Sequence, residues 1–242
     1  MLVTQEFTIK VDGNTILNDL TLEYGPGVHI IMGPNGVGKS TFAHALMGNP
    51  NYETEGAVEF NGKDLLSMET YERARAGLFI SFQTPTPIEG LSNFQFIKQA
   101  MTSLEKNQSI KENLSNFRES ANDLGLGSEW DKKTLNVEAS GGEKKKNELI
   151  QLDMLDPQTA ILDEPDSGLD IDAIKVLVEK LRAFVNKGDK TLIIVSHYAE
   201  LITKLNPDTL TILDKQGNAK QTEDIQIAYD ILENGFNGWT RI

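Results

Sequence analysis

A glycine-rich segment at residues 33–40 sets narrow limits on the fold of this chain. It reads Gly33-Pro34-Asn35-Gly36-Val37-Gly38-Lys39-Ser40 and follows an apolar run at residues 28–32. The string fits the phosphate-binding pattern G-x-x-x-x-G-K-[ST]. Glycines let backbone N–H groups converge on phosphate oxygens, and a helix that begins there directs its positive dipole end at the same anion. We predict a buried strand, a phosphate-binding loop and a helix over residues 40–47, with Thr41 also in the site.

Lys39 and Ser40 carry the charged and hydroxyl groups of this predicted site. The lysine ammonium suits the β- and γ-phosphates, and the serine hydroxyl suits Mg²⁺. A chance glycine-rich turn is the plainer alternative. The position of the segment between a strand and a helix favours the phosphate site.

The rest of the chain alternates between strand and helix patterns. Expected strands at residues 77–82, 159–162, 191–196 and 209–213 alternate with expected helices at residues 142–154 and 171–184. This order predicts an α/β fold with a mostly parallel sheet covered on both faces. Before it, strands at residues 7–11 and 16–23 flank Asp12-Gly13-Asn14, which predicts an N-terminal antiparallel β subdomain.

A helical segment interrupts this alternation. Thr84-Pro85-Thr86-Pro87 is a stiff linker, because each proline restricts itself and its predecessor. Phe94, Ile97, Met101 and Leu104 then recur at helical spacing, and a second helix is indicated up to residue 126. We expect one domain over residues 1–242, with a core at 1–83 and 140–242 and a helical insert at 84–139.

An acidic pair predicts the metal and catalytic groups. Asp163 ends the apolar strand pattern, and Glu164 follows it. Open α/β sheets place ligands at the carboxyl ends of strands, so Asp163 suits Mg²⁺ and Glu164 suits activation of water. Alone, such a pair is more often solvated. Beside a phosphate loop, the catalytic interpretation is favoured.

Six motifs together resemble those of the ABC ATPase family. Besides residues 33–40 and the acidic pair, they are Gln83, Ser140-Gly141-Gly142-Glu143, Ser167-Gly168-Leu169-Asp170 and His197. The resemblance implies binding of ATP and Mg²⁺, and ATP hydrolysis in a homodimer. Ser140, Gly141 and Gly142 would face the γ-phosphate held by the other copy, and Asp170 would lie between the two sites. Gln83 would contact the metal and the attacking water, and His197 the γ-phosphate.

Longer segments resemble the SufC branch of that family, which serves iron–sulfur cluster assembly. They are residues 136–148, 161–173 and 196–198, with a further likeness at residues 235–239. Ala139 and Lys146 depart from the branch pattern, where an aromatic residue and arginine are usual. The resemblance implies SufB- and SufD-like scaffold proteins as partners. Phe94, Phe96 and Ile97 are candidate docking residues, although we expect two of the three to pack inside the insert.

Val11 stands where ABC proteins often stack an aromatic ring on adenine. Stacking of a base on an aromatic side chain contributes about 1–3 kcal/mol. We therefore expect adenine to be held weakly or with loose selectivity before dimerisation.

Charge and cysteine content exclude several functions. The formal net charge is −13, which argues against nucleic-acid partners and against adsorption to anionic lipid. The chain has no cysteine, so cluster-binding thiolates must come from a partner. No secretory signal or membrane-inserted segment is expected, and we predict a cytoplasmic protein. The alternatives are the ATP-binding subunit of a membrane transporter and an ATP sensor that barely hydrolyses ATP.

Overall fold

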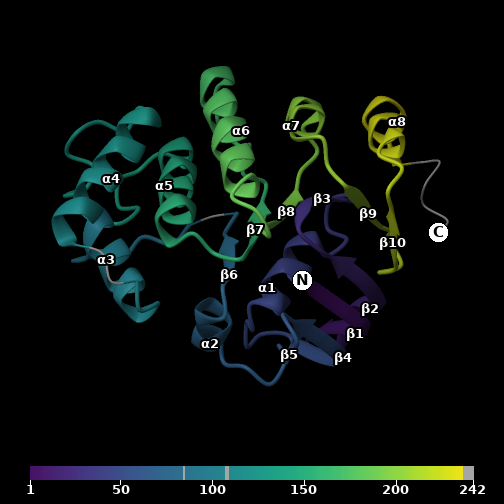
Figure 1. Cartoon of the computed structure of the whole chain (residues 1–242). Helices are drawn as coiled ribbons and strands as arrows, with labels where there is room; N and C mark the ends of the chain where they lie inside the picture. The colour runs from purple at the N-terminus through teal and green to yellow at the C-terminus, as the bar shows by residue number, and fades with distance from the viewer. Residues whose placement is uncertain (84, 107–108, 237–242) are drawn as a thin grey trace.

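Two sheets and the helices around them build the fold in a computed structural model that describes residues 1–83, 85–106 and 109–236 (Figure 1). Thr84, at the start of the predicted linker and insert, and residues 237–239 of the predicted C-terminal likeness lie outside the described residues. The strands are β1 Leu2–Val11, β2 Asn14–Tyr24, β3 Gly27–Met32, β4 Glu53–Phe60, β5 Lys63–Asp64, β6 Leu78–Ser81, β7 Thr159–Asp163, β8 Thr191–Val195, β9 Thr209–Leu213 and β10 Ala219–Thr222. The helices are α1 Lys39–Leu46, α2 Thr70–Arg75, α3 Asn93–Ser103, α4 Ile110–Asp123, α5 Gly141–Leu155, α6 Ile171–Val185, α7 Ala199–Leu205 and α8 Gln226–Asn234.

The larger sheet has the strand order β10-β9-β3-β8-β7-β6. All neighbouring pairs are parallel except β9 and β10, so the predicted mostly parallel sheet is confirmed. The smaller sheet, β2-β1-β4-β5, is antiparallel throughout, as predicted for the N-terminal part. Strand β1 of this sheet is longer than expected, because it begins at Leu2 rather than at residue 7.

Helix α1 lies between the two sheets. Its residues Phe42 and Leu46 pack in one apolar cluster with Phe7 of β1 and Ile31 of β3. The opposite face of the large sheet is covered by a second apolar cluster that includes residues of α5, α6, α7 and α8. Strand β3 contributes to both clusters, which explains its uninterrupted apolar sequence. The start of α1, and therefore the loop before it, is fixed by packing on both sides.

Helices α3 and α4 lie beside α5 at one end of the molecule, as Figure 1 shows. Ile97 of α3 is buried in their core, and Phe94 packs edge-on against Phe117 of α4. The division of the chain at residues 84 and 139 into core and insert stays a prediction.

A buried polar network ties α5 to the segments around it. Asn147 of α5 accepts from the Trp130 indole at 2.9 Å and donates to Asn93 at 3.0 Å and Asn136 at 3.3 Å. Asn136 in turn donates to the carbonyl of Thr86, in the stretch after β6. Because buried polar groups are costly when unpaired, this network fixes α5 relative to that stretch.

Candidate nucleotide-binding and catalytic site

The predicted site residues meet at the carboxyl edge of the large sheet. The phosphate loop follows β3, His197 follows β8, Asp163 ends β7 and Gln83 follows β6. These four strands are adjacent in the sheet, with Ile31 and Asp163 both paired to Val195 of β8. A cavity of about 420 Å³ is lined here by Asn35, Gly36, Gly38, Lys39, Ser40, Thr41, Gln83 and Glu164.

Glycine is required at two positions of the loop. Gly38 has φ 106°, and a Cβ there would lie 2.9 Å from Ile16. A Cβ on Gly33 would lie 2.7 Å from the carbonyl oxygen of Leu213. Gly38 is also the residue at which α1 begins. The loop can therefore follow this path only with glycine at these positions, as the phosphate motif demands.

Lys39 is enclosed by its own loop. Its Nζ donates to the carbonyls of Gly33 at 2.8 Å and Pro34 at 3.0 Å. Burial lowers the pKa of Lys39, while Glu164 and Asp163 raise it. The ammonium group is thus held at the base of the cavity among acidic neighbours.

The Asp163 carboxylate fits a cation site. Its side chain is 1% exposed, and neither carboxylate oxygen has a hydrogen-bond partner among the described residues. A buried, unpartnered carboxylate is unfavourable unless something positive compensates it. The described residues contain no group of three or more His, Cys, Asp or Glu side chains that could hold a metal. Asp163 and Ser40 therefore suit a Mg²⁺ ion that also takes oxygen ligands from phosphates.

Glu164 is held in a strained, left-handed backbone conformation with φ 48°. Its backbone N–H donates to Val195 at 2.9 Å and its carbonyl accepts from Ser167 at 3.1 Å. Its carboxylate accepts from Gln83 Nε2 at 3.1 Å. A strained backbone conformation persists only where surrounding bonds enforce it. Here the bonds to Val195 and Ser167 hold the Glu164 backbone, and its carboxylate lies against Gln83.

His197 is half-buried, and its Nε2 has no hydrogen-bond partner among the described residues. Burial is the main cause that lowers its pKa, with Lys39 acting in the same direction and Glu164 and Asp166 opposing. A neutral imidazole is thus favoured, and its Nε2 is buried in this conformation without a partner among the described residues.

The Ser-Gly-Gly motif begins α5. Ser140 caps the helix by accepting from the Glu143 N–H at 3.2 Å, and Glu143 accepts from the Ser140 N–H at 2.9 Å. These bonds lower the pKa of Glu143. A Cβ on Gly141 would meet nothing within 4 Å, so packing of the chain does not itself require glycine there. Asp170 similarly caps α6 by accepting from Ala173 at 2.8 Å.

Lys145 and Glu148, to which sequence reasoning gave no role, link α5 to the site. Lys145 Nζ donates to the carbonyls of Phe82 at 2.9 Å and Asp163 at 3.0 Å, the residues directly before Gln83 and Glu164. Glu148 accepts from the Phe82 N–H at 2.8 Å. Their side chains are 6% and 7% exposed. The helical spacing of Lys145 and Glu148 places both on one face of α5. The sequence alone did not show that this face is buried against the ends of β6 and β7.

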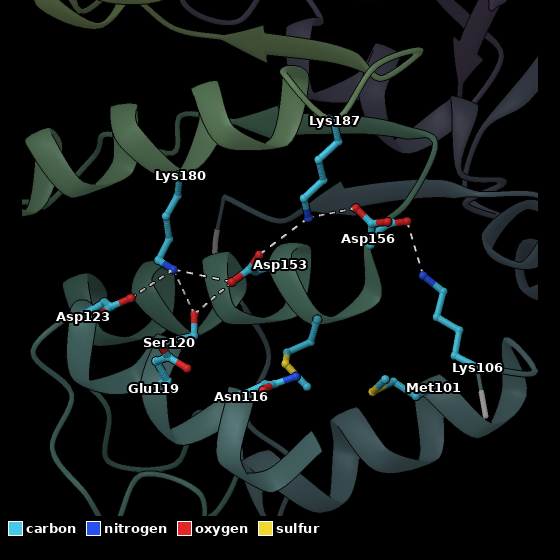
Figure 2. A pocket seen from close by; sticks show the side chains of 11 residues that line it. Met101, Lys106, Asn116, Glu119, Ser120, Asp123, Asp153, Asp156, Lys180 and Lys187 are labelled. Carbon is cyan, nitrogen blue, oxygen red and sulfur yellow. Dashed lines mark hydrogen bonds and ion pairs between the residues drawn. The ribbon is translucent and has the colours of Figure 1, made fainter. Parts of the chain in front are cut away.

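Another polar cavity, of about 470 Å³, lies between α3, α4, α5 and α6 (Figure 2). Lys180 bridges Asp153 at 3.5 Å and Asp123 at 3.8 Å, and Lys187 lies 3.1 Å from Asp156. Because lysines and carboxylates neutralise each other here, the cavity has no evident preference for a charged ligand.

The chain belongs to the ABC transporter family of ATP-binding proteins, whose pattern it matches over residues 17–167. It binds and hydrolyses ATP. It is 38% identical to the "Probable ATP-dependent transporter SufC" of Escherichia coli, covering 99% of this chain and 98% of the relative. It is also 38% identical to the "Probable ATP-dependent transporter ycf16" of Cyanophora paradoxa, covering 96% of this chain and 94% of the relative. The predicted resemblance to SufC is confirmed.

Solved structures share the fold. An ATP-binding subunit of an ABC transporter superposes with a TM-score of 0.80 at 22% identity, covering 96% of this chain and 93% of that one. An ATP-binding cassette solved as a post-hydrolysis dimer with ADP and Pi superposes with a TM-score of 0.78 at 19% identity, covering 92% of this chain and 98% of that one. The predicted ABC ATPase fold is therefore confirmed. No helix in the described part of the chain is long and apolar enough to cross a membrane.

Burial raises the pKa of Glu148 to about 7 from an ordinary 4.5, despite the opposing effect of Lys145. Between these values the folded chain keeps a proton that the unfolded chain loses, so stability falls as pH rises from 4.5 to 7. Glu148→Gln stays neutral and removes this contribution. Between pH 4.5 and 7 the unfolding free energy of Glu148→Gln should therefore fall by about 1–3 kcal/mol less than that of the parent chain. Urea titrations at several pH values measure this difference.

The matched control is Glu179→Gln, on the exposed face of α6. It should leave the pH dependence of stability as it is in the parent chain. If the unfolding free energies of the parent and of Glu148→Gln changed with pH in the same way, the raised pKa of Glu148 would be refuted.

Proposed function

We propose that this chain is the ATPase subunit of an iron–sulfur cluster assembly complex, in which Mg-ATP bound between two copies drives movement of SufB- and SufD-like scaffold proteins. The observation that carries the proposal is the similarity to SufC over nearly the entire chain. The absence of cysteine agrees with it, because thiolate ligands for a cluster would have to come from the scaffold. A cytoplasmic location is part of the proposal.

The phosphate loop and α1 bind the nucleotide. The N–H groups of residues 35–41 surround the phosphates, and Lys39 exchanges its bonds to Gly33 and Pro34 for phosphate oxygens. Ser40, Gln83 and Asp163 would hold Mg²⁺, which would supply positive charge beside the phosphates. Val11 ends β1 without an aromatic ring, so weak or loosely selective adenine binding stays a prediction.

Glu164 activates water, and His197 binds the γ-phosphate. Glu164 leaves its bond with Gln83 and accepts a proton from the attacking water. As the oxygen of that water bonds to the γ-phosphorus, the bond from the γ-phosphorus to the β–γ bridging oxygen breaks, and ADP leaves with that oxygen. Gln83 orients that water, and the unpartnered Nε2 of His197 contacts the phosphate. Lys145 supports both loops by bonding the backbone just before Gln83 and Glu164.

The second copy completes each site. Gly141 and Gly142 begin a helix of fifteen residues whose N–H groups suit an anion, and its N-terminal end is exposed at Gly141. Because the chain's own packing leaves open space at Gly141, we attribute the glycine to close approach by the other copy's nucleotide. Asp170, at the start of α6, lies between the two sites in this arrangement.

An apolar groove supports a partner surface. It has a volume of about 560 Å³ and is lined by residues of α2, β6, α3 and α5, among them Tyr71, Phe82, Phe96 and Leu104. Tyr71 is 58% exposed and Phe82 47%. Phe82 directly precedes Gln83, so a scaffold segment in this groove would touch the residue next to the catalytic loop. Of the three predicted docking residues, Phe96 lines the groove.

A membrane transporter's ATP-binding subunit is the second candidate. Several relatives from Streptococcus pyogenes are named as probable ABC transporter ATP-binding proteins and are 39% identical over 95% of this chain. The catalytic residues would serve both functions equally. The partner therefore distinguishes them.

Glu164→Gln removes the proposed base and should lower ATP turnover at least about 100-fold. ATP binding should survive, because the phosphate loop is unchanged, and the dimer should accumulate. Phosphate release, calorimetry and gel filtration with ATP measure these effects. Lys39→Ala should instead lose tight ATP binding, and Glu129→Gln, an exposed carboxylate paired with Lys132, should behave as the parent. Parent-like turnover in Glu164→Gln would contradict the assignment.

Cysteines placed at Ser40 and Gly141 test the dimer. We expect a disulfide between copies when ATP is present and little without it, since each nucleotide would bring the two positions together. The natural chain has no cysteine, so each band on a non-reducing gel comes from the introduced pair. The single variants serve as controls, and an ATP-dependent crosslink that never forms would refute the shared site.

A tagged chain recovered from its native cells should carry soluble proteins similar to SufB and SufD. Tyr71→Glu places a charge in the apolar groove and should reduce their recovery at least about tenfold, as loss of a buried aromatic anchor does. Ile110→Glu, equally exposed at the start of α4 but outside the groove, is the control. Recovery of an integral membrane subunit instead would favour the transporter.

A further inference from the structure

We propose that Phe236 is a positioning residue for His197, whose imidazole it holds in the orientation used at the γ-phosphate. The inference rests on the role proposed above for His197. It also gives a function to the end of the chain, where residues 235–239 resemble the SufC branch without carrying any catalytic group.

The two rings meet edge to face. Their centroids are 6.1 Å apart and their planes are inclined by 89°. This geometry is the favourable one for aromatic pairs, because the positive edge of one ring faces the negative face of the other. Since His197 Nε2 has no hydrogen-bond partner among the described residues, ring packing is what restricts the imidazole on that side.

The position of Phe236 is itself well determined. Ala228 and Ile231 of α8 are buried in the apolar cluster that covers the large sheet, and Phe236 packs against the same cluster. Gly235 ends α8 with φ 74°, and its N–H donates to Ile231 at 2.8 Å. This positive φ, with ψ −179°, suits glycine, and Phe236 directly after it contacts His197 in the loop after β8. A residue anchored in this way can orient its neighbour.

The charged groups that act on His197 come from two other segments. They are Lys39 of α1, and Glu164 and Asp166 in the loop after β7. Burial is nevertheless the largest cause that lowers the His197 pKa. Removal of the Phe236 ring would admit water without changing those charges, so the His197 pKa should rise toward its ordinary value.

The test compares Phe236→Ala, Phe236→Tyr and Leu181→Ala in the full chain. NMR titration follows the His197 ring, which is assigned by its loss in His197→Gln. In Phe236→Ala we expect a higher His197 pKa and a kcat lower by about tenfold, with KM for ATP within about twofold, because a displaced catalytic group affects the chemical step. Phe236→Tyr keeps an aromatic ring at this position, and its His197 pKa and kcat should match those of the parent.

Leu181→Ala separates positioning from general loss of stability. It opens the same apolar cluster from α6 rather than from α8, and should lower the unfolding midpoint while leaving the His197 pKa and kcat unchanged. The proposal is overturned if Phe236→Ala matches the parent, or if Leu181→Ala reproduces its effects. Parent-like turnover in His197→Gln would refute the proposed role of His197, whereas the NMR titration would still report on the contact with Phe236.

Discussion

The parallel hydrogen-bond ladder through β3, β8, β7 and β6 is the constraint from which the site follows. Ile31 and Asp163 both pair with Val195, so the phosphate loop, the acidic pair and His197 all leave the sheet at the same level. Neighbouring strands lie about 4.8 Å apart, which sets the spacing of the loops that follow them. The catalytic groups are thus brought together by backbone bonds between strands that are distant in sequence. Contacts among the catalytic side chains only refine that arrangement, as the bond between Gln83 and Glu164 does.

Helix α5 connects two functions that the sheet keeps apart. Its first turn presents Gly141 outward, and its second turn directs Lys145 to the carbonyls of Phe82 and Asp163. A helix is stiff over so short a distance, so force on its N-terminus moves Lys145 as well. The same lysine is buried beside Glu148, which would be left poorly paired if Lys145 withdrew. In the proposed dimer, α5 would therefore couple the nucleotide bound by the other copy to Gln83 and Glu164 of its own.

The sequence predicted those parts of the site in which each residue type has its own chemical reason. The glycines, Lys39 and Ser40 could be placed in advance, and so could the strands that precede Asp163 and His197. Helices α7 and α8 and the strand β10 were not predicted, because they have only 7, 9 and 4 residues, and the two helices depend on the large sheet for burial. The contacts of Lys145, Glu148 and Phe236 were also missed. They join segments far apart in the chain, and no local pattern shows which face of a helix will lie against a strand end.

Three of the side chains proposed for catalysis, Lys39, Gln83 and Glu164, are hydrogen-bonded to other protein groups in this structure. Lys39 is bonded to its own loop, and Glu164 to Gln83. Substrate binding must exchange each of these bonds for another, so the net gain from the exchange is modest. Contacts that shift the loop after β6 would change that balance, and Phe82 lies in the apolar groove immediately before Gln83. In the proposed complex, a partner in the groove would act on Gln83 through Phe82, and a second copy at α5 would act on Gln83 and Glu164 through Lys145. This convergence is the physical reason to expect that hydrolysis depends on the assembled complex more than on the isolated chain.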